Sequence, residues 1–279
     1  MTRRLLRLLR LLAHHQTFTL GTLLVAMLIV AAFAAPLIAH QDPMATSSRT
    51  FEPPLARNIM GTDQLGRDLW AEVVYGARVS LTVGVGASLI STFIGLCIGV
   101  LAGYRGGPTD VVLMRVAEFF QVIPQFFLAI VLVALIGRGV DRVTIVLGVL
   151  GWPLVARIVR AQFLALRAVE FTEAARAIGA GDWYIANRVM LPHALPPVIV
   201  AATQNVSHAI LLESGIAFFG LGDPNLVSWG AMLNAAQAYL GQSWWISVFP
   251  GAAIALSVIG FSLLGDGLND LLNQRARRS

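Results

Sequence analysis

The polar segment from residue 170 to residue 192 carries side chains whose types and spacing suit a specific interaction. Glu170, Glu173 and Arg176 recur at helical spacing and form a charged border. The neighbouring helical positions are small or apolar, namely Phe171, Ala174, Ala175 and Ile178. Alanines allow another protein to approach closely, and an acidic border orients that partner. The segment therefore predicts a helix that inserts into a groove of a second protein.

A helix break and a second helix complete this segment. The Gly-Ala-Gly run at 179–181 is expected to end the first helix, because glycine tolerates the left-handed turn at a helix C-terminus. Asp182 is expected to cap the second helix. The apolar members of that helix lead into the apolar stretch that follows Leu191 and Pro192, and they are Trp183, Ile185, Ala186 and Val189.

An alternative interpretation of this segment is an amphipathic helix that rests in the lipid headgroup layer. Such helices favour Lys and Arg on their polar face and large apolar anchors on the other face. The first helix here is acidic and rich in alanine. Its composition therefore favours docking on a protein.

The basic residues exclude several kinds of chemistry. All 20 of them are Arg, and Lys is absent from the sequence. A P-loop needs Lys to reach the nucleotide phosphates, and a Schiff-base cofactor also needs Lys. The histidines are dispersed without ligand spacing, at positions 14, 15, 40, 193 and 208. We therefore expect no ATPase centre, no cofactor and no metal site in this chain, and any energy source must be a partner or a gradient.

The composition indicates a polytopic membrane protein embedded in a lipid bilayer. Hydrophobic residues make up 57% of the 279 residues and charged residues only 13%, and the mean hydropathy is +0.73. Soluble domains carry about 25% charged residues. The net charge of +5 does not indicate a nucleic-acid partner, because the arginines are scattered between apolar stretches and do not cluster on one surface.

Six apolar windows are long enough to cross about 30 Å of hydrocarbon as helices. They predict an all-α fold with six transmembrane helices, over residues 18–39, 79–103, 111–136, 143–159, 195–221 and 245–264. The first window follows four arginines, as in a secretory signal. Its apolar run exceeds the about 7–15 residues of a typical signal, so an uncleaved helix is expected.

Arginine placement predicts the orientation of these helices. With the N-terminus inside, 14 arginines lie on the inner side and six on the outer side, which agrees with the positive-inside rule. Both termini are then cytoplasmic. The expected parts are a basic N-terminus at 1–17, a transmembrane domain at 18–268 with an extracytoplasmic excursion at about 40–76 and a cytoplasmic loop at about 160–194, and a tail at 269–279.

Two residues inside the apolar windows are candidates for a transport pathway. Glu213 lies deep in the fifth window, where a charge costs about 2.5–3.5 kcal/mol on insertion scales. It either faces the pathway and meets a cationic group of the substrate, or it pairs and packs with other residues. Pro124 is expected to kink the third window, as prolines do in helices.

Other polar and small residues in these windows indicate packing. Gly95, Gly99 and Gly103 share one helix face, where a second helix can approach closely. Arg115 and Glu118 are three residues apart and are expected to form a local ion pair.

The polar segment also carries a recognisable motif. Residues 173–175 (Glu-Ala-Ala), Gly179, Val189 and residues 191–192 (Leu-Pro) resemble the EAA signature of ABC-importer permeases, with Val189 in place of isoleucine. Four other segments resemble the dipeptide, oligopeptide and nickel branch of that family, namely 61–68 (GTDQLGRD), 152–160 (WPLVARIVR), 219–222 (FGLG) and 263–270 (LLGDGLND). Asn269 stands where arginine is common. The likeness extends from about residue 18 onward.

This resemblance implies the type I ABC-importer permease fold and the role of the second permease subunit in such an importer. The motif would form a coupling loop that docks on the ATPases. The docking residues implied are Glu170, Glu173, Ala174, Ala175, Arg176, Gly179, Leu191 and Pro192.

The implied partners are a homologous permease, two cytoplasmic ATPases that bind the ATP, and an extracytoplasmic substrate-binding protein. The implied location is a bacterial or archaeal cytoplasmic membrane. Peptides are the expected cargo, with nickel or another small solute as the alternative. A gradient-driven secondary transporter is the rival class, but inverted repeats and broken helices around a midplane site are not evident. An intramembrane enzyme would need convergent acid, base or metal residues, which do not gather in this sequence.

Overall fold

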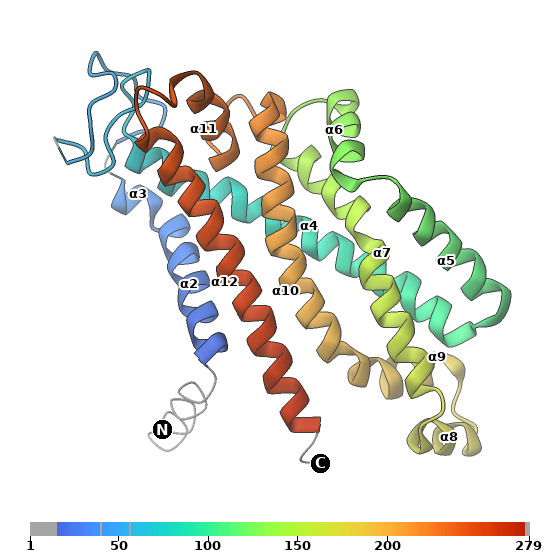
Figure 1. Ribbon diagram of the computed structural model, residues 1–279. Helices are drawn as coiled ribbons and strands as arrows, with labels where there is room; N and C mark the ends of the chain where they lie inside the picture. The colour runs from blue at the N-terminus through green and yellow to red at the C-terminus, as the bar shows by residue number, and fades with distance from the viewer. Residues whose placement is uncertain (1–15, 40, 56, 277–279) are drawn as a thin grey trace, which may run out of the picture.

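The computed structural model describes residues 16–39, 41–55 and 57–276, and these residues form a helical bundle (Figure 1). The expected basic N-terminus lies almost entirely outside the described residues, as do the last three residues of the tail. The bundle has two ends. We call the end that carries the segment after residue 166 the loop end, and the opposite end, which carries residues 41–68, the cap end (Figure 1).

The expected helical class is confirmed. The long helices are α2 (Gln16–Phe33), α4 (Leu69–Arg105), α7 (Val140–Leu166), α10 (Leu191–Ile216) and α12 (Trp245–Ala276). Short helices join them, namely α3 (Ala35–Ile38), α8 (Glu170–Ala177), α9 (Asp182–Tyr184) and α11 (Trp229–Ala236), with π-helices at Ile185–Met190 and Ala217–Leu221 and a 3₁₀ turn at Gln237–Tyr239. Helices prevail because backbone groups in hydrocarbon must find their hydrogen bonds within their own segment.

The third expected span is broken. Its residues form α5 (Gly107–Val122) and α6 (Gln125–Ile136), which meet at an angle of 84°. Pro124 stands at the N-cap of α6, and its missing N–H and ring prevent a continuous helix at this position. The expectation of a kink at Pro124 is therefore confirmed, while the expectation of one helix over 111–136 is wrong. Within the described part of the chain, five helices are long and apolar enough to cross a membrane, or six if the bent pair forms one span.

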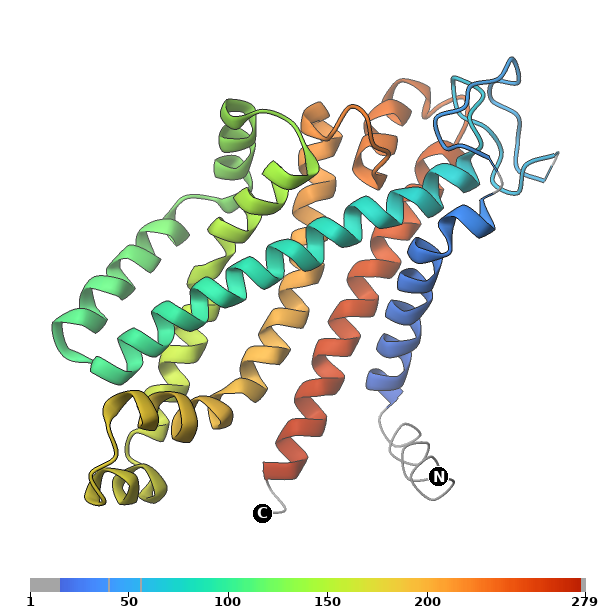
Figure 2. The same cartoon turned by 180° about the vertical axis from the view of Figure 1, so that it is seen from behind.

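Helix α4 begins earlier than the sequence indicated. It starts at Leu69, within the segment expected to form the extracytoplasmic excursion. The helix has 37 residues and is about 55 Å long, which exceeds about 30 Å of hydrocarbon. It crosses the other helices obliquely over one face of the bundle, as Figure 2 shows.

The predicted glycine packing is confirmed between α4 and α7. A Cβ on Gly99 would lie 2.6 Å from the carbonyl oxygen of Ala156 and 2.6 Å from the Cβ of Val159. Gly95 and Gly103 meet Val155 and Phe163 in the same way, each at 2.6 Å. The two backbones approach closely along this seam because side chains are missing from one of them. The seam fixes α7, which leads directly into the polar segment.

We expect Gly99→Ala to destabilise the chain by about 1–3 kcal/mol, because the added methyl group overpacks the seam. The control is Gly251→Ala in α12, where the new Cβ would meet nothing within 4 Å. Thermal unfolding of the purified protein in detergent measures both variants. Equal midpoints for the two variants would contradict the proposed tight seam.

Candidate coupling loop and membrane-embedded polar residues

The polar segment projects from the loop end between α7 and α10 (Figure 1). Its first helix, α8, is anchored by two residues that face the protein. Thr172 is fully buried and its hydroxyl donates a hydrogen bond to the carbonyl of Leu166 at 2.9 Å. Ala175 is 9% exposed and packs in an apolar cluster with Val159 and Ile185. These contacts fix one face of α8 on its own chain.

The opposite face of α8 is exposed. Glu170 and Glu173 lie in its first turn, Ala174 is exposed, and Ile178 is 84% exposed just after the helix. The apolar face that the sequence predicted is therefore divided. Ala175 packs inward, while Ala174 and Ile178 point away with the two carboxylates. Acidic residues in a first turn also interact favourably with the helix dipole.

The helix ends where the sequence predicted. Gly179 has φ +82°, a left-handed conformation that favours glycine. The N–H of Gly179 donates to the carbonyl of Arg176 at 2.9 Å, and the N–H of Ala180 donates to that of Ala175 at 3.1 Å. The side chain of Arg176 turns back and donates to the carbonyl of Arg167 at 3.3 Å. These bonds satisfy the final turn of the helix.

The expected capping role of Asp182 is wrong. Gly181 occupies the N-cap of α9, and the Asp182 carboxylate instead accepts a hydrogen bond at 2.7 Å from the hydroxyl of Tyr104. Tyr104 belongs to the last turns of α4. The bond therefore ties the loop to the helix that carries the glycine seam. Sequence reasoning missed Tyr104, because the two residues stand 78 positions apart.

The return to the membrane also differs in detail from the expectation. Of the apolar members named from the sequence, Trp183 is 81% exposed. Ile185 and Ala186 are buried as predicted. The chain then passes through the π-helix Ile185–Met190 into α10, where Leu191 is half-buried and Pro192 is exposed.

One aromatic contact joins the two halves of the loop. The ring of Phe171 on α8 stacks on the ring of His193 near the start of α10, with centroids 4.7 Å apart and planes at 24°. Tyr104 and Asp182 provide the second tie, and Thr172 the third. The loop is therefore attached to α4, α7 and α10 at once.

Glu213 is enclosed in this conformation. It is 4% exposed, and its carboxylate accepts a hydrogen bond from the hydroxyl of Ser80 on α4 at 3.0 Å and a weaker one from Ser214 at 3.5 Å. A cavity of about 10 Å³ adjoins it, and Ser228 also lines this cavity. The geometry brings together α4, α10 and the start of α11. The pathway role expected of Glu213 stays a prediction.

The predicted ion pair between Arg115 and Glu118 is confirmed on α5, with 3.0 Å between Nη1 and Oε2. Both side chains are more than half exposed. A second pair joins the guanidinium of Arg160 on α7 to the carboxylate of Asp110 on α5. The second pair braces α5 against α7 near the loop end.

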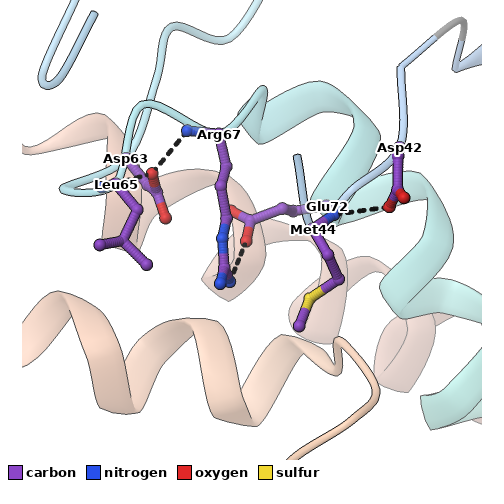
Figure 3. Close-up of polar contacts among 6 residues, drawn as sticks. All are labelled: Asp42, Met44, Asp63, Leu65, Arg67 and Glu72. Carbon is purple, nitrogen blue, oxygen red and sulfur yellow. Dashed lines mark hydrogen bonds and ion pairs between the residues drawn. The ribbon is translucent and has the colours of Figure 1, made fainter. Parts of the chain in front are cut away.

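The segment at 61–68 forms a compact turn at the cap end (Figure 3). Oδ1 of Asp63 accepts hydrogen bonds from the backbone N–H groups of Leu65 and Arg67, both at 2.8 Å. The guanidinium of Arg67 reaches Glu72 in the first turn of α4 at 3.6 Å. The indole N–H of Trp245 donates to the carbonyl of Thr62 at 3.1 Å, so this turn joins the start of α12 to the start of α4.

Burial shapes the electrostatics of this turn. Asp68 is 9% exposed at the N-cap of α4. Loss of water raises the pKa of its carboxyl, and the nearby N–H groups of Ala71 and Trp70 oppose that rise. The sequence alone did not explain the structural role of the GTDQLGRD element. The structure shows that its charged residues shape the turn before α4, and that its Thr62 carbonyl binds the start of α12.

These features define a multi-pass helical membrane protein with an anchored, acidic loop at one end. The sequence profile of the family described as "Binding-protein-dependent transport system inner membrane component" matches residues 95–278, and the chain belongs to this family. It is a permease subunit of an ABC transporter.

Curated relatives cover nearly the whole chain. The dipeptide transport permease of Bacillus subtilis is 38% identical over 92% of this chain and 82% of its own length. The di/tripeptide transport permease of Pseudomonas aeruginosa is 35% identical over 95% and 90%. The glutathione transport permease of Pectobacterium atrosepticum is 35% identical over 96% and 90%.

Solved structures support the fold. A chain of the MetNI methionine ABC transporter, in an inward-facing conformation, aligns with a TM-score of 0.55 at 22% identity over 70% of this chain and 93% of that chain. A chain of an amino acid ABC transporter aligns with a TM-score of 0.53 at 18% identity over 73% and 94%. At these identities the likeness concerns the fold.

We expect Tyr104→Phe to loosen the loop without unfolding the bundle. The lost hydrogen bond contributes about 0.5–1.5 kcal/mol, so amide hydrogen exchange at residues 180–186 should become several-fold faster. The control is Tyr184→Phe, which changes an exposed ring in the same loop. Mass spectrometry of deuterated peptides measures both variants, and unchanged exchange in Tyr104→Phe would show that the bond does not hold the loop.

Proposed function

We propose that this chain is the second permease subunit of an ATP-driven peptide importer. The observation that carries the proposal is the geometry of α8, which is fixed on one face by Thr172 and Ala175 and presents Glu170, Glu173 and Ala174 on the other. A rigid, acidic, small-residue surface suits the cleft of a partner protein. The EAA signature lies on this same surface.

The energy for transport comes from two partner ATPases. The chain lacks Lys, so it has no P-loop of the usual kind and no ATPase activity of its own. The ATPases bind the ATP and dock on the coupling loop, which includes Gly179 and Arg176 and ends at Leu191 and Pro192. Closure of the ATPases then moves the loop as a rigid body, in an alternating-access cycle.

The loop end faces the cytoplasm, and the cap end faces outward. The start of α2 and the end of α12 both lie at the loop end, as Figure 1 shows. This arrangement supports two cytoplasmic termini in a bacterial or archaeal inner membrane. An extracytoplasmic substrate-binding protein delivers the cargo at the cap end. A homologous permease packs beside this chain, and the pathway runs between the two subunits, with the break at Pro124 beside it.

Peptides are the cargo that the relatives favour. The permeases of Bacillus subtilis and Pseudomonas aeruginosa named above are dipeptide and di/tripeptide transporters, and that of Pectobacterium atrosepticum transports glutathione, itself a short peptide. Nickel or another small solute is the alternative by the same mechanism.

Reconstitution in proteoliposomes tests the proposal. The complete complex contains both permeases, the ATPases and the binding protein. It should accumulate labelled dipeptide only when ATP is present on the side of the membrane that carries the ATPases. Uphill uptake by this chain alone, or uptake that collapses with the proton or sodium gradient instead of ATP, would refute it and support a secondary transporter.

We expect Glu173→Lys to abolish ATP-dependent uptake, because charge reversal on the exposed face of α8 opposes docking. The amount of chain in the membrane should not change. The control is Glu118→Lys on α5, which reverses another exposed carboxylate away from the loop. Co-purification of the ATPases with each variant measures docking, and normal retention by Glu173→Lys would argue against this surface.

We expect Gly179→Val to reduce uptake strongly, because a left-handed conformation is strained by about 1–2 kcal/mol for ordinary residues and more for β-branched ones. Gly181→Val is a matched control in the same loop. A Cβ at either position would meet nothing within 4 Å, but Gly181 has φ −68° and ψ 154°, which valine adopts readily. Uptake rates separate the two, and equal losses would point to side-chain size instead of backbone conformation.

A further inference from the structure

Four polar side chains form a track along one face of α10. Nε2 of His208 lies 3.3 Å from Oε1 of Gln125 at the start of α6. One turn earlier on α10, the side-chain amide of Gln204 donates to Oδ1 of Asp266 on α12 at 3.2 Å. We call Gln125, His208, Gln204 and Asp266 the polar track. It extends from the break between α5 and α6, across α10, to α12, and these helices are neighbours in Figure 1.

His208 lies at membrane depth, whereas Asp266 lies two residues past the apolar window 245–264. His208 is about 25 Å of helix from Leu191 and about 20 Å from Leu221, which places it near the middle of a hydrocarbon layer about 30 Å thick. Gln204, His208 and Asp266 are nevertheless exposed on the surface of this chain. Their exposure distinguishes them from Glu213, which is enclosed by the protein.

Lipid does not suit such a surface. Ionisable side chains inside a membrane cost free energy and almost always face the protein interior or a water-filled cavity. The face of α2 shows what a lipid-compatible surface of this chain looks like, since its exposed side chains at mid-helix are Leu23, Met27 and Val30, at 63%, 53% and 61%. The track therefore faces water or a polar partner in the assembled transporter.

Aromatic rings bound the track toward the cap end. The ring of Phe126, next to Gln125, lies 2.7 Å from where a Cβ on Gly215 would be, so α6 approaches α10 closely there. Phe126 also contacts Phe219, with ring centroids 6.0 Å apart. Polar side chains thus line the inner part of this face and rings close its outer part.

We propose that the polar track is this subunit's wall of the water-filled pathway and that it hydrogen-bonds the backbone of a passing peptide. Glutamine amides offer both donors and acceptors, which match the N–H and C=O groups of any peptide regardless of its side chains. Asp266 adds a carboxylate for the peptide ammonium group. The peptide part of this inference rests on the function proposed above, whereas the water-filled wall does not.

Thiol accessibility tests the wall. The chain has one cysteine, Cys97, so Cys97→Ser provides a cysteine-free background. Gln204→Cys and His208→Cys report on the track, and Leu23→Cys and Met27→Cys are controls on α2. Each variant is assembled with its partner subunits in lipid nanodiscs and treated with a charged methanethiosulfonate, which reacts with thiolates in water.

We expect the two track cysteines to react at least about tenfold faster than the α2 cysteines, because thiolates form in water and not in lipid. Addition of dipeptide, binding protein and ATP should slow the track reactions and leave the controls unchanged. Track rates equal to the α2 rates would overturn the water-filled wall. Fast rates that peptide transport leaves unchanged would overturn peptide contact.

A near-isosteric substitution tests the hydrogen-bonding role separately. Gln204→Met retains the length of the side chain and removes its amide, and Leu23→Met is the control. We expect Gln204→Met to lower peptide imported per ATP hydrolysed by about threefold or more, through loss of a hydrogen bond. ATPase stimulation by the binding protein should persist. Equal loss of uptake and ATPase activity would indicate a packing role and contradict the inference.

These measurements separate the two proposals. If the unsubstituted complex imports no peptide but the track cysteines still react fast, the peptide function fails and the water-filled wall stands. If peptide import proceeds and the track cysteines remain as slow as the controls, the function stands and the track fails.

Discussion

A backbone inside hydrocarbon has to satisfy its own N–H and C=O groups, and two breaks in the described helices can be understood under that constraint. The break between α5 and α6 occurs at Pro124, whose nitrogen carries no N–H to satisfy. The turn in the π-helix Ala217–Leu221 falls at Gly220, with φ +78°, close to the cap end. There the amide of Asn234 donates to the carbonyl of Phe218 at 2.6 Å. At the turn near Gly220 a side-chain amide thus satisfies a backbone carbonyl, and at Pro124 one backbone donor is absent.

The same constraint favours long regular helices, and the glycine seam packs two of them tightly against each other. Gly99 lets the backbone of α4 reach that of Ala156 on α7. At the loop end, α7 runs into α8, and the last turns of α4 hold Asp182 through Tyr104. A force applied to α8 is thus passed to a pair of helices packed backbone to backbone. Such a pair transmits displacement well, because a close-packed interface deforms little.

How far the sequence alone could predict this structure depended on the range of each interaction. Local signals succeeded, because Gly179, Pro124 and the pair of Arg115 and Glu118 act through neighbours within one or two turns. The glycine seam succeeded as well, since three glycines on one face have few roles other than close packing.

Signals that depend on distant segments failed or were incomplete. Asp182 is a good cap by type, but Tyr104 competes for its carboxylate, and this partner comes from another helix. The sequence grouped Trp183 with Ile185 and Ala186 as apolar members of one helix, but the fold buries Ile185 and Ala186 and leaves Trp183 81% exposed. The apolar window began at residue 79, ten residues after the start of α4, because the first turns of this helix carry charged residues such as Glu72, which the fold buries at the cap end.

The burial of each polar residue changes which of them are the better candidates for a functional role. In a single sequence, Glu213 attracts attention because a carboxylate within apolar residues is costly. The structure surrounds it with hydroxyl groups, including that of Ser80, which offset part of that cost inside the subunit. Gln204 and His208 are weaker signals in sequence, yet they stand on an exposed face at similar depth. An enclosed acid can be satisfied by its own chain, whereas an exposed polar residue needs something outside the chain. For that reason Gln204 and His208 are more informative than Glu213 about the proposed pathway of the assembled transporter.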